Sequence, residues 1–364
     1  MTNRERFRAA MAFEPVDRPC HVEHGFWPET WQRWRKEGLP EGIKCPVLSY
    51  MGDRPDLFDY FDVIRYGQVR PEQYLLRHSE GQVLEETESW VMYRDGWGRT
   101  IKSSKIGASV PQFLDYPIKT RHDYEAMREQ LAPVVDARYP ANFDEIAAEM
   151  KAQDEVVVCA HMDGFFGFPR ELIGAERVLF MYYDDPDLMR EIIADRVEFL
   201  MTVYERAIRE TTPDFAFVWE DMCYTNGPLV GPNLFREFLL PAYKKLTSWL
   251  RDMGVTSIIV DSDGDVRLLL PLWLEGGVTG CLPFEVKAGM DVVKLGEEFP
   301  TLQIIGGVDK HVLERTKADV DAEVERVVPA MMKRSGFAVS LDHHVQPEVP
   351  MENYRHFCER VREC

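Results

Sequence analysis

The sequence lacks the features of several protein classes. Its seven cysteines form no CxxC pair and no compact framework, which argues against a disulfide-stapled secreted domain and fits a reducing cytoplasm. No apolar run approaches the roughly 20 residues that a membrane-spanning helix requires. The first residues, from Thr2 to Arg8, have the pattern of a capped, charged helix and not of a signal peptide. We therefore expect a cytoplasmic protein that crosses no membrane.

Motifs of common enzyme classes are also missing. The chain contains no GxGxxG or Walker sequence for nucleotide phosphates, no HExxH zinc-protease pattern and no GxSxG nucleophile elbow. Basic residues are scarce, since 43 of them stand against 62 acidic ones and give a formal net charge of -19. Such a surface repels nucleic acids and anionic lipids, so the expected partner is a small-molecule substrate.

From about residue 155 onward, short apolar segments alternate with longer segments of helical period. This alternation is typical of βα units around a parallel sheet. The expected strands are 155–160, 214–219, 255–260, 278–283, 302–306 and 336–341, and the expected helices are 186–210, 232–252, 266–275, 290–298, 317–334 and 351–362.

Two further candidate strands, 20–23 and 62–66, raise the count to eight. Eight such units form a (β/α)8 TIM barrel, so the prediction is one α/β domain over residues 1–364 with an N-terminal extension. An open doubly wound sheet is the competing architecture, but it usually carries the Gly-rich turn that is missing here. The barrel is therefore favoured.

Residues 80–118 interrupt the alternation. Asp95 and Gly96 lie between two alternating segments, which predicts an inserted β-hairpin. If the insertion lies on the face where the βα loops gather, it covers the catalytic mouth with Trp97 as a lid residue. If it lies elsewhere, it is an edge hairpin without a role in the chemistry. The sequence leaves both interpretations open.

Several apolar strands end abruptly in polar residues. The segment 258–265 is the clearest case, because the apolar residues 258–260 are followed by three aspartates within five positions. Buried charge requires a cation, a cluster of hydrogen-bond donors or a substrate. In a barrel the carboxyl ends of all strands share one face, so these side chains converge. The candidates at such ends are Glu23, His24, His161, Glu220, Asp221, Asp261, Asp263 and His343.

Two roles are assigned from residue chemistry. His161, Glu220 and Asp221 are the expected catalytic groups, because imidazole and carboxylate exchange protons near neutral pH, although a structural histidine is an equal alternative for His161. Aromatic rings near the strand ends suit a flat substrate such as a methoxylated ring, and core packing explains them equally well. The expected substrate contacts are Glu23, His24, Trp27, Phe166 and Trp219.

Four short segments stand out along the chain: Arg18-Pro19, 226–232 (NGPLVGP), 304–310 (IIGGVDK) and 345–354 (VQPEVPMENY). Together they resemble the uroporphyrinogen decarboxylase superfamily, in order, from about residue 3 to residue 362. The resemblance implies a (β/α)8 barrel with one of two activities. These are cofactor-independent decarboxylation of uroporphyrinogen, and zinc-dependent methyl transfer between methylated compounds, corrinoid proteins and thiols. Homodimers are frequent in this superfamily.

The chain departs from both patterns. The decarboxylases carry an Arg-Gln-Ala-Gly-Arg segment after the first strand, where residues 23–27 read Glu-His-Gly-Phe-Trp, and so acidic a pocket repels an octacarboxylate. The methyltransferases bind zinc through a His-x-Cys pair and a later Cys. Asp261 and Asp263 stand at the positions of that pair, and His343 falls near the later Cys. The resemblance therefore implies a metal held by Asp261, Asp263 and His343.

Carboxylate and imidazole ligands suit zinc first, with manganese or iron as alternatives. The other reading is that the two carboxylates pair with arginine or backbone amides. We predict a metal-dependent methyltransferase that acts on a small methylated compound, with the methylcorrinoid carried by a partner protein. A cofactor-independent decarboxylase of a small organic acid or a tetrapyrrole-like substrate is the alternative enzyme. A barrel that binds a ligand without turning it over is the alternative outside catalysis.

Overall fold

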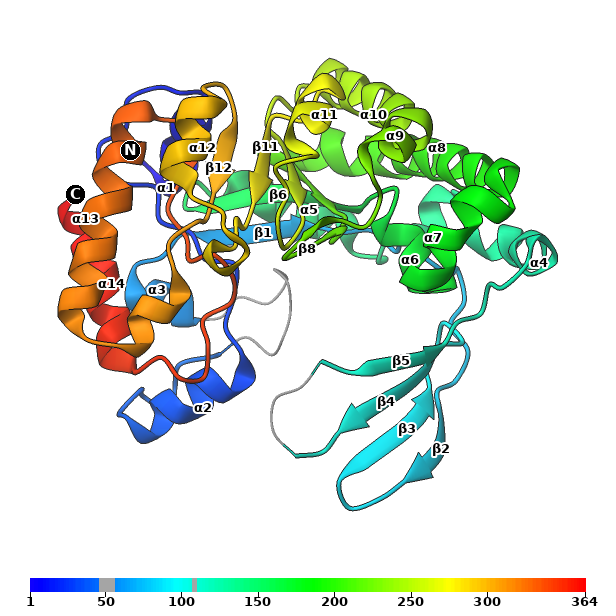
Figure 1. The fold of residues 1–364 in the computed structure, drawn as a ribbon, viewed down its shortest axis with the longest axis horizontal. Helices are drawn as coiled ribbons and strands as arrows, with labels where there is room; N and C mark the ends of the chain where they lie inside the picture. The colour runs from blue at the N-terminus through cyan, green and yellow to red at the C-terminus, as the bar shows by residue number, and fades with distance from the viewer. Residues whose placement is uncertain (46–55, 107–109) are drawn as a thin grey trace.

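The computed structural model describes residues 1–45, 56–106 and 110–364. At its centre lies a parallel sheet of seven strands in the order β1-β6-β7-β10-β11-β12-β13 (Figure 1). The sheet is curled and TIM-barrel-like, in agreement with the predicted α/β class. Its strands are β1 (Arg65–Val69), β6 (Val156–Asp163), β7 (Phe215–Trp219), β10 (Ile258–Asp261), β11 (Gly280–Leu282), β12 (Gln303–Ile305) and β13 (Phe337–Ala338).

One N-terminal segment contacts both outer strands of this sheet. His21 forms a parallel bridge with Val339, directly after β13, and Val22 forms one with Ile64, directly before β1. The amide of Val22 donates to the Val339 carbonyl at 2.9 Å, and the amide of Ile64 donates to the His21 carbonyl at 2.8 Å. Residues 20–23, which the sequence predicts as a strand, therefore run between the two edges of the sheet.

Helices follow the strands and cover the outside of the sheet (Figure 1). The predicted helix 232–252 is divided, because a π-helical turn at Phe235–Leu239 separates the short α9 (Pro232–Leu234) from α10. Among the described helices, none is long and apolar enough to span a bilayer. The main helices are α4 (Arg121–Leu131), α5 (Phe143–Ala152), α6 (Gly167–Ile173), α7 (Ala175–Asp184), α8 (Pro186–Thr211), α10 (Leu240–Asp252), α11 (Leu270–Glu275), α12 (Val292–Glu298), α13 (Lys317–Arg334) and α14 (Met351–Glu363).

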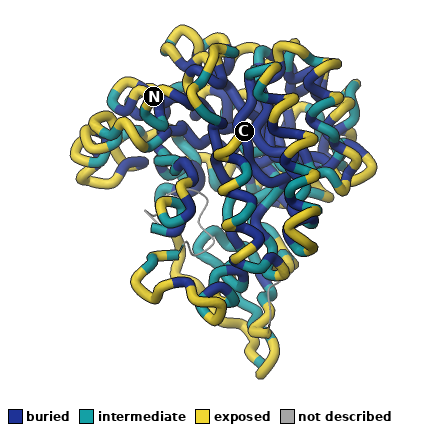
Figure 2. Tube along the Cα trace, turned by 90° about the vertical axis from the view of Figure 1, so that its left-hand side faces the viewer, coloured by how far each residue is buried: buried dark blue, intermediate teal, exposed yellow. Residues whose placement is uncertain are grey.

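Side chains alternate between the two faces of the curled sheet. In β7, Phe215 and Phe217 lie in an inner apolar cluster. Cys20, Val22 and the sheet strands β6, β10, β11, β12 and β13 also contribute to it. Ala216 and Val218 instead lie in the large core between sheet and helices. Figure 2 shows this buried interior beneath an exposed outer layer. Because the period of a strand is two residues, this alternation also decides which polar residue at a strand end faces inward.

The insertion is larger than the predicted hairpin. Strands β3 (Trp90–Arg94) and β4 (Thr100–Ser104) pair antiparallel around the expected Asp-Gly turn. Two more strands, β2 (Gln82–Glu86) and β5 (Gln112–Asp115), widen it into a four-stranded sheet that projects from the body of the protein (Figure 1). Polar residues dominate the outer strand β2, so its strand pattern is weak in the sequence.

The N-terminal helix α1 (Asn3–Met11) closes the amino-terminal side of the sheet. Phe7 packs against Phe215 of β7 with a ring-centroid distance of 5.1 Å. Arg4 and Asp214, which precedes β7, form a buried ion pair at 2.9 Å. The Asp214 carboxylate also accepts the Val158 amide at 2.7 Å. One carboxylate thus ties the helix to two strands.

Replacing Asp214 should therefore destabilise the fold. Asp214→Ala leaves the Arg4 guanidinium buried without its partner, and loss of one member of a buried pair costs roughly 3–5 kcal/mol. The matched control is Glu205→Ala, which removes an exposed pair with Arg209 on α8 and should change stability by less than about 1 kcal/mol. Thermal and urea unfolding of the two variants and the parent measure the difference. Equal effects in both variants would contradict this account.

Candidate active site

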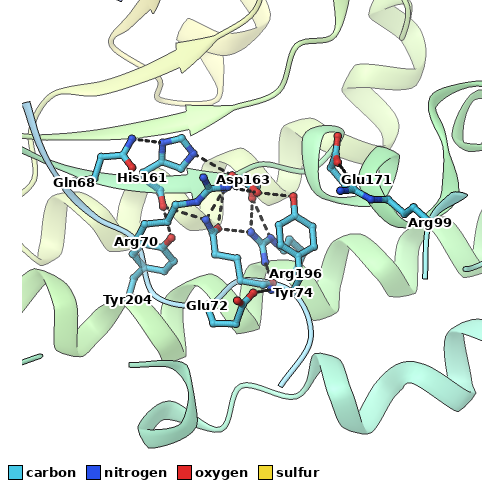
Figure 3. A network of polar contacts seen from close by, with 11 residues as sticks. Gln68, Arg70, Glu72, Tyr74, Arg99, His161, Asp163, Glu171, Arg196 and Tyr204 are labelled. Atoms are coloured by element: carbon cyan, nitrogen blue, oxygen red, sulfur yellow. Dashed lines mark hydrogen bonds and ion pairs between the residues drawn. The ribbon is translucent and has the colours of Figure 1, made fainter. Parts of the chain in front are cut away.

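His161 and Asp163 end β6 on its inner face. His161 Nε2 lies 3.1 Å from Asp163 Oδ1, and His161 Nδ1 lies 3.2 Å from the Gln68 amide nitrogen (Figure 3). The imidazole also stacks on Phe217 with a centroid distance of 4.7 Å. Burial and the charge of Arg70 lower the pKa of His161, although Asp163 acts in the opposite direction. The predicted catalytic histidine is therefore a neutral ring with both nitrogens held in place.

Asp163 is the centre of this network. Its carboxylate accepts from Arg70 Nη2 at 3.1 Å and from the Tyr74 hydroxyl, and its amide donates to Gln73 Oε1 at 2.8 Å (Figure 3). Burial raises the pKa of Asp163, but the His161 hydrogen bond and the Arg70 charge outweigh burial and hold it well below its usual range. Asp163 is thus a stable anion that fixes the groups around it.

A cavity of about 210 Å³ opens beside this network. Trp97, from the turn between β3 and β4, stacks on Tyr74 with a centroid distance of 4.0 Å. The Arg99 guanidinium lies 4.2 Å from the Trp97 ring centroid and also pairs with Glu171 (Figure 3). Trp97 of the insertion therefore forms part of the cavity wall. The lining residues are Arg70, Tyr74, Trp97, His161, Asp163, Glu171 and Trp219.

Asp221 and Trp219 lie near a second arginine. Arg170 Nη1 is 2.6 Å from Asp221 Oδ2, and the guanidinium lies 5.5 Å from the Trp219 ring centroid. Burial raises the pKa of Asp221 more than Arg170 lowers it. Phe166, a predicted substrate contact, is fully buried in the large core. Of the predicted aromatic contacts from this region, Trp219 is the one that lines the cavity.

Glu220 lies on the outer face of the sheet. Its carboxylate accepts the amides of Phe165, Phe166 and Gly167 at 2.9, 2.7 and 2.8 Å, together with the Tyr243 hydroxyl of α10. Burial raises the pKa of Glu220, and these hydrogen bonds act against the rise. The contacts hold the start of α6 in place, so the geometry gives Glu220 a structural role. The catalytic role that the sequence suggests for it stays a prediction.

Three histidines gather where residues 20–26 meet the segment after β13. His24 directly follows residues 20–23, and His343 and His344 lie in the loop after β13. Each of these three residues offers one ring nitrogen as a possible metal ligand, and the three nitrogens all lie within 4.8 Å of one another. The Nδ1 atoms of His343 and His344 are 3.2 Å apart. Burial, together with the charges of His344 and His343, lowers the pKa of His24 well below its ordinary value, and burial with His343 lowers that of His344 to about 3.

The predicted metal ligands are brought together in part. His343 Nε2 lies 3.5 Å from Asp263 Oδ2, and this contact raises the pKa of His343 even though burial lowers it. Burial raises the pKa of Asp263 too, but the hydrogen bond from His343 makes the net shift downward. Asp261 is buried and points inward; burial and the charges of Asp263 and Asp221 raise its pKa well above the ordinary range.

Two predicted substrate contacts flank the histidine group. Glu23 is buried, lies 3.2 Å from His21 Nε2 and accepts the Ser340 hydroxyl at 3.2 Å. The Trp27 ring centroid is 6.0 Å from that of His344. Glu23 therefore ties the first segment to the residues after β13, and Trp27 borders the histidines. These roles in substrate binding stay predictions.

Sequence reasoning missed several residues of this site. Asp163 follows His161 by two positions and Arg70 follows Gln68 by two, so the strand period alone places each pair on one face. That signal was available. No strand period marks Tyr74 or His344, because both lie in loops, and none marks Glu171, because it lies in α6.

Asp163→Asn should lower the stability of the protein in a pH-dependent way. At pH 7 the variant loses charged hydrogen bonds, for which we expect a cost of about 1–3 kcal/mol. The folded pKa of Asp163 is depressed, so its stabilisation is complete above the unfolded pKa of about 3.9 and is lost progressively as the pH falls from there toward the much lower folded pKa. Urea unfolding at pH 7 and near pH 3.5 should show the gap between variant and parent beginning to narrow at the lower pH.

The control for this measurement is Asp252→Asn, at an exposed position at the end of α10. Its stability should follow that of the parent at both pH values. A gap for Asp163→Asn that stays constant or widens in acid would contradict the assigned charge state.

Comparison with known proteins shows which sequences this chain is similar to. The uroporphyrinogen decarboxylase of Geobacter metallireducens (strain ATCC 53774 / DSM 7210 / GS-15) is 31% identical over 137 residues, which is 38% of this chain and 39% of that protein, less than half its length. The uroporphyrinogen decarboxylase of Geobacter sulfurreducens (strain ATCC 51573 / DSM 12127 / PCA) is 25% identical over 258 residues, covering 68% of this chain and 72% of that protein.

A solved structure supports the fold over the full length. The methyltransferase from Methanosarcina mazei aligns with a TM-score of 0.67 at 16% identity, covering 100% of this chain and 99% of that chain. The family model for uroporphyrinogen decarboxylase (URO-D) matches residues 96–364. These matches confirm the resemblance drawn from the motifs, and the chain belongs to the uroporphyrinogen decarboxylase family.

Proposed function

We propose that this chain is a metal-dependent methyltransferase that moves a methyl group between a small methylated compound and a separate corrinoid protein. The observation that carries the proposal is the pairing of His343 with Asp263 at 3.5 Å. His343 also belongs to a group of three histidines whose potential ligand atoms lie within 4.8 Å of one another. We also take the curled sheet to be a complete (β/α)8 barrel, with residues 20–23 as its first strand.

A divalent metal fits the residues on this side of the mouth. Imidazole nitrogen and carboxylate oxygen both bind zinc, and manganese or iron are the alternatives among harder ligand sets. The site would hold the metal through His343, with Asp261 and Asp263 as the further ligands that the sequence suggests. A bound metal supplies Lewis-acid polarisation of the oxygen or sulfur that carries the methyl group.

The chain's own residues bind and orient the substrate. The cavity of about 210 Å³ presents the flat rings of Trp97 and Trp219. These walls suit a methylated aromatic ring and exclude water from it. Arg70 and His161 are both fixed by Asp163, so the polar groups of the cavity keep one arrangement while the substrate enters. Binding in one orientation brings the methyl group to one reactive position.

Two arginines near the strand ends are already paired. Arg70 contacts Asp163 and Arg170 contacts Asp221, so each cation is neutralised by a neighbouring carboxylate. An octacarboxylate needs several unpaired cations, and the net charge of -19 opposes its approach. This pairing disfavours decarboxylation of uroporphyrinogen.

A decarboxylase of a smaller acid is the second candidate function. Burial and the charges of Asp263 and Asp221 raise the pKa of Asp261, which favours the neutral form of this inward-facing carboxyl. A neutral acid can protonate the carbanion that remains after carbon dioxide leaves. This route uses no metal and no corrinoid protein.

His343→Ala should reduce methyl transfer at least about 100-fold in kcat/KM, because it removes the residue that would hold the metal. The assay follows formation of methylcorrinoid by visible absorption, with a methoxylated aromatic compound and a reduced corrinoid protein. The control is Asp265→Asn in the same loop, whose carboxylate pairs with Arg267 on the surface and whose rate should match the parent.

Two other results would refute the methyltransferase, and a third would refute only the role of His343. Release of carbon dioxide from a small acid by protein without metal or corrinoid would establish the decarboxylase. Specific ligand binding without any product would establish a binding barrel. Full methyl transfer by His343→Ala would remove the assigned role of this residue.

A further inference from the structure

We propose that His24, His343 and His344 together form a divalent-metal site, with Asp263 holding His343 from behind as a positioning residue and not as a ligand. The two segments that carry these histidines meet at the mouth through a β-bridge. The inference rests on the proposed methyltransferase for the use of the metal. It replaces Asp261 and Asp263 with His24 and His344 in the ligand set.

The distances between the imidazole nitrogens are the first observation that supports a shared metal. All three potential ligand atoms lie within 4.8 Å of one another. The Nδ1 atoms of His343 and His344 are 3.2 Å apart. Two nitrogens on one tetrahedral zinc, each about 2.0–2.1 Å from the metal, lie about 3.4 Å apart. The pair is therefore already at the separation that a shared metal requires.

The rings are held in this position by the backbone. Phe26 and Val345 form a parallel bridge, and the Val345 amide donates to the Gly25 carbonyl at 2.9 Å. Gly25 has a φ of +155°, and a Cβ at this position would lie 2.6 Å from the His344 ring. Glycine next to His24 therefore allows the His344 ring to come close to the first segment.

Asp263 completes the arrangement from the other side. It lies 3.5 Å from His343 Nε2, while His343 Nδ1 faces His344. Metal-binding histidines commonly place their second nitrogen against a carboxylate, which fixes the ring and makes it a stronger ligand. In this geometry Asp263 acts through His343. Asp263 in the loop after β10 therefore has a role that requires no contact with the metal itself.

The chemistry of the donors selects the ion. Three imidazoles with an open fourth position match catalytic zinc, and copper, nickel and iron also accept imidazole. Magnesium and manganese prefer oxygen ligands, so they should bind poorly. The Asp263 carboxylate, which lies beside His343, adds negative potential near this group and so favours a dication. Lys310, which pairs with Asp342, is the cation that faces this group.

The test is direct metal binding by the full chain. Protein stripped with a chelator is titrated with zinc, and bound metal is counted by mass spectrometry. The parent should bind about one zinc per chain, and His24→Ala and His344→Ala should each weaken binding at least about 100-fold. Asp263→Asn should weaken it about 10-fold to 100-fold. Asp261→Asn and the exposed control His122→Ala should bind like the parent.

A second readout identifies the ligands. Cobalt in place of zinc should give the visible bands of a four-coordinate site in the parent and in Asp261→Asn, and these bands should be lost in His344→Ala. Circular dichroism shows whether each variant is folded. If an alanine variant does not fold, His24→Gln and His344→Gln take its place.

Each outcome decides the inference. Parent protein that binds no zinc overturns it, and so does metal that persists without His24 and His344 but is lost in Asp261→Asn. The proposed function can fail separately. Metal bound as predicted by a protein that transfers no methyl group would leave this site standing and remove the methyltransferase. Metal-dependent methyl transfer by protein whose zinc binding is unchanged in His24→Ala and His344→Ala would do the reverse.

Discussion

Burial of carboxylates at the carboxyl ends of parallel strands is the constraint on which the rest of the structure depends. Asp163, Glu220 and Asp261 are all buried at such ends. A buried charge is tolerated only if it is paired, hydrogen-bonded or removed by protonation. The three carboxylates differ in how their charge is accommodated. Asp163 is paired with Arg70, Glu220 accepts three backbone amides, and Asp261 has a raised pKa.

The period of the β-strand separates these roles. Asp221 and Asp263 come to the mouth, whereas Glu220 turns outward to the start of α6 and to Tyr243. One residue along the chain is enough to move a carboxylate from the mouth to the helical layer. The side chains of β6 and β10 follow the same rule, so the inner set forms one polar surface across several strands.

The mouth has two parts with different chemistry. The cavity beside β6 is lined by aromatic rings and by side chains fixed through Asp163, and the inserted sheet contributes Trp97 to its wall. The other part holds three histidines from the two segments that meet near the first strand. The first part suits the flat substrate, and the second the ion, that the proposed methyltransferase would use.

The sequence by itself determined the fold class and the family. Regular alternation of apolar strands and amphipathic helices is local information, so six predicted strands and their helices recur in the structure within a few residues. The motif order was enough to identify the family, which the match over 96–364 confirms. The polar strand ends at His161 and Asp221 were visible for the same reason.

Only the tertiary structure decided which of these residues meet. The contact between His24 and His344 joins positions at opposite ends of the chain, and it exists because residues 20–23 lie beside β13. The position of Trp97 over Tyr74 depends on how the inserted sheet folds back on the body. Contacts of this kind arise from packing between distant segments, and a local pattern carries no information about them.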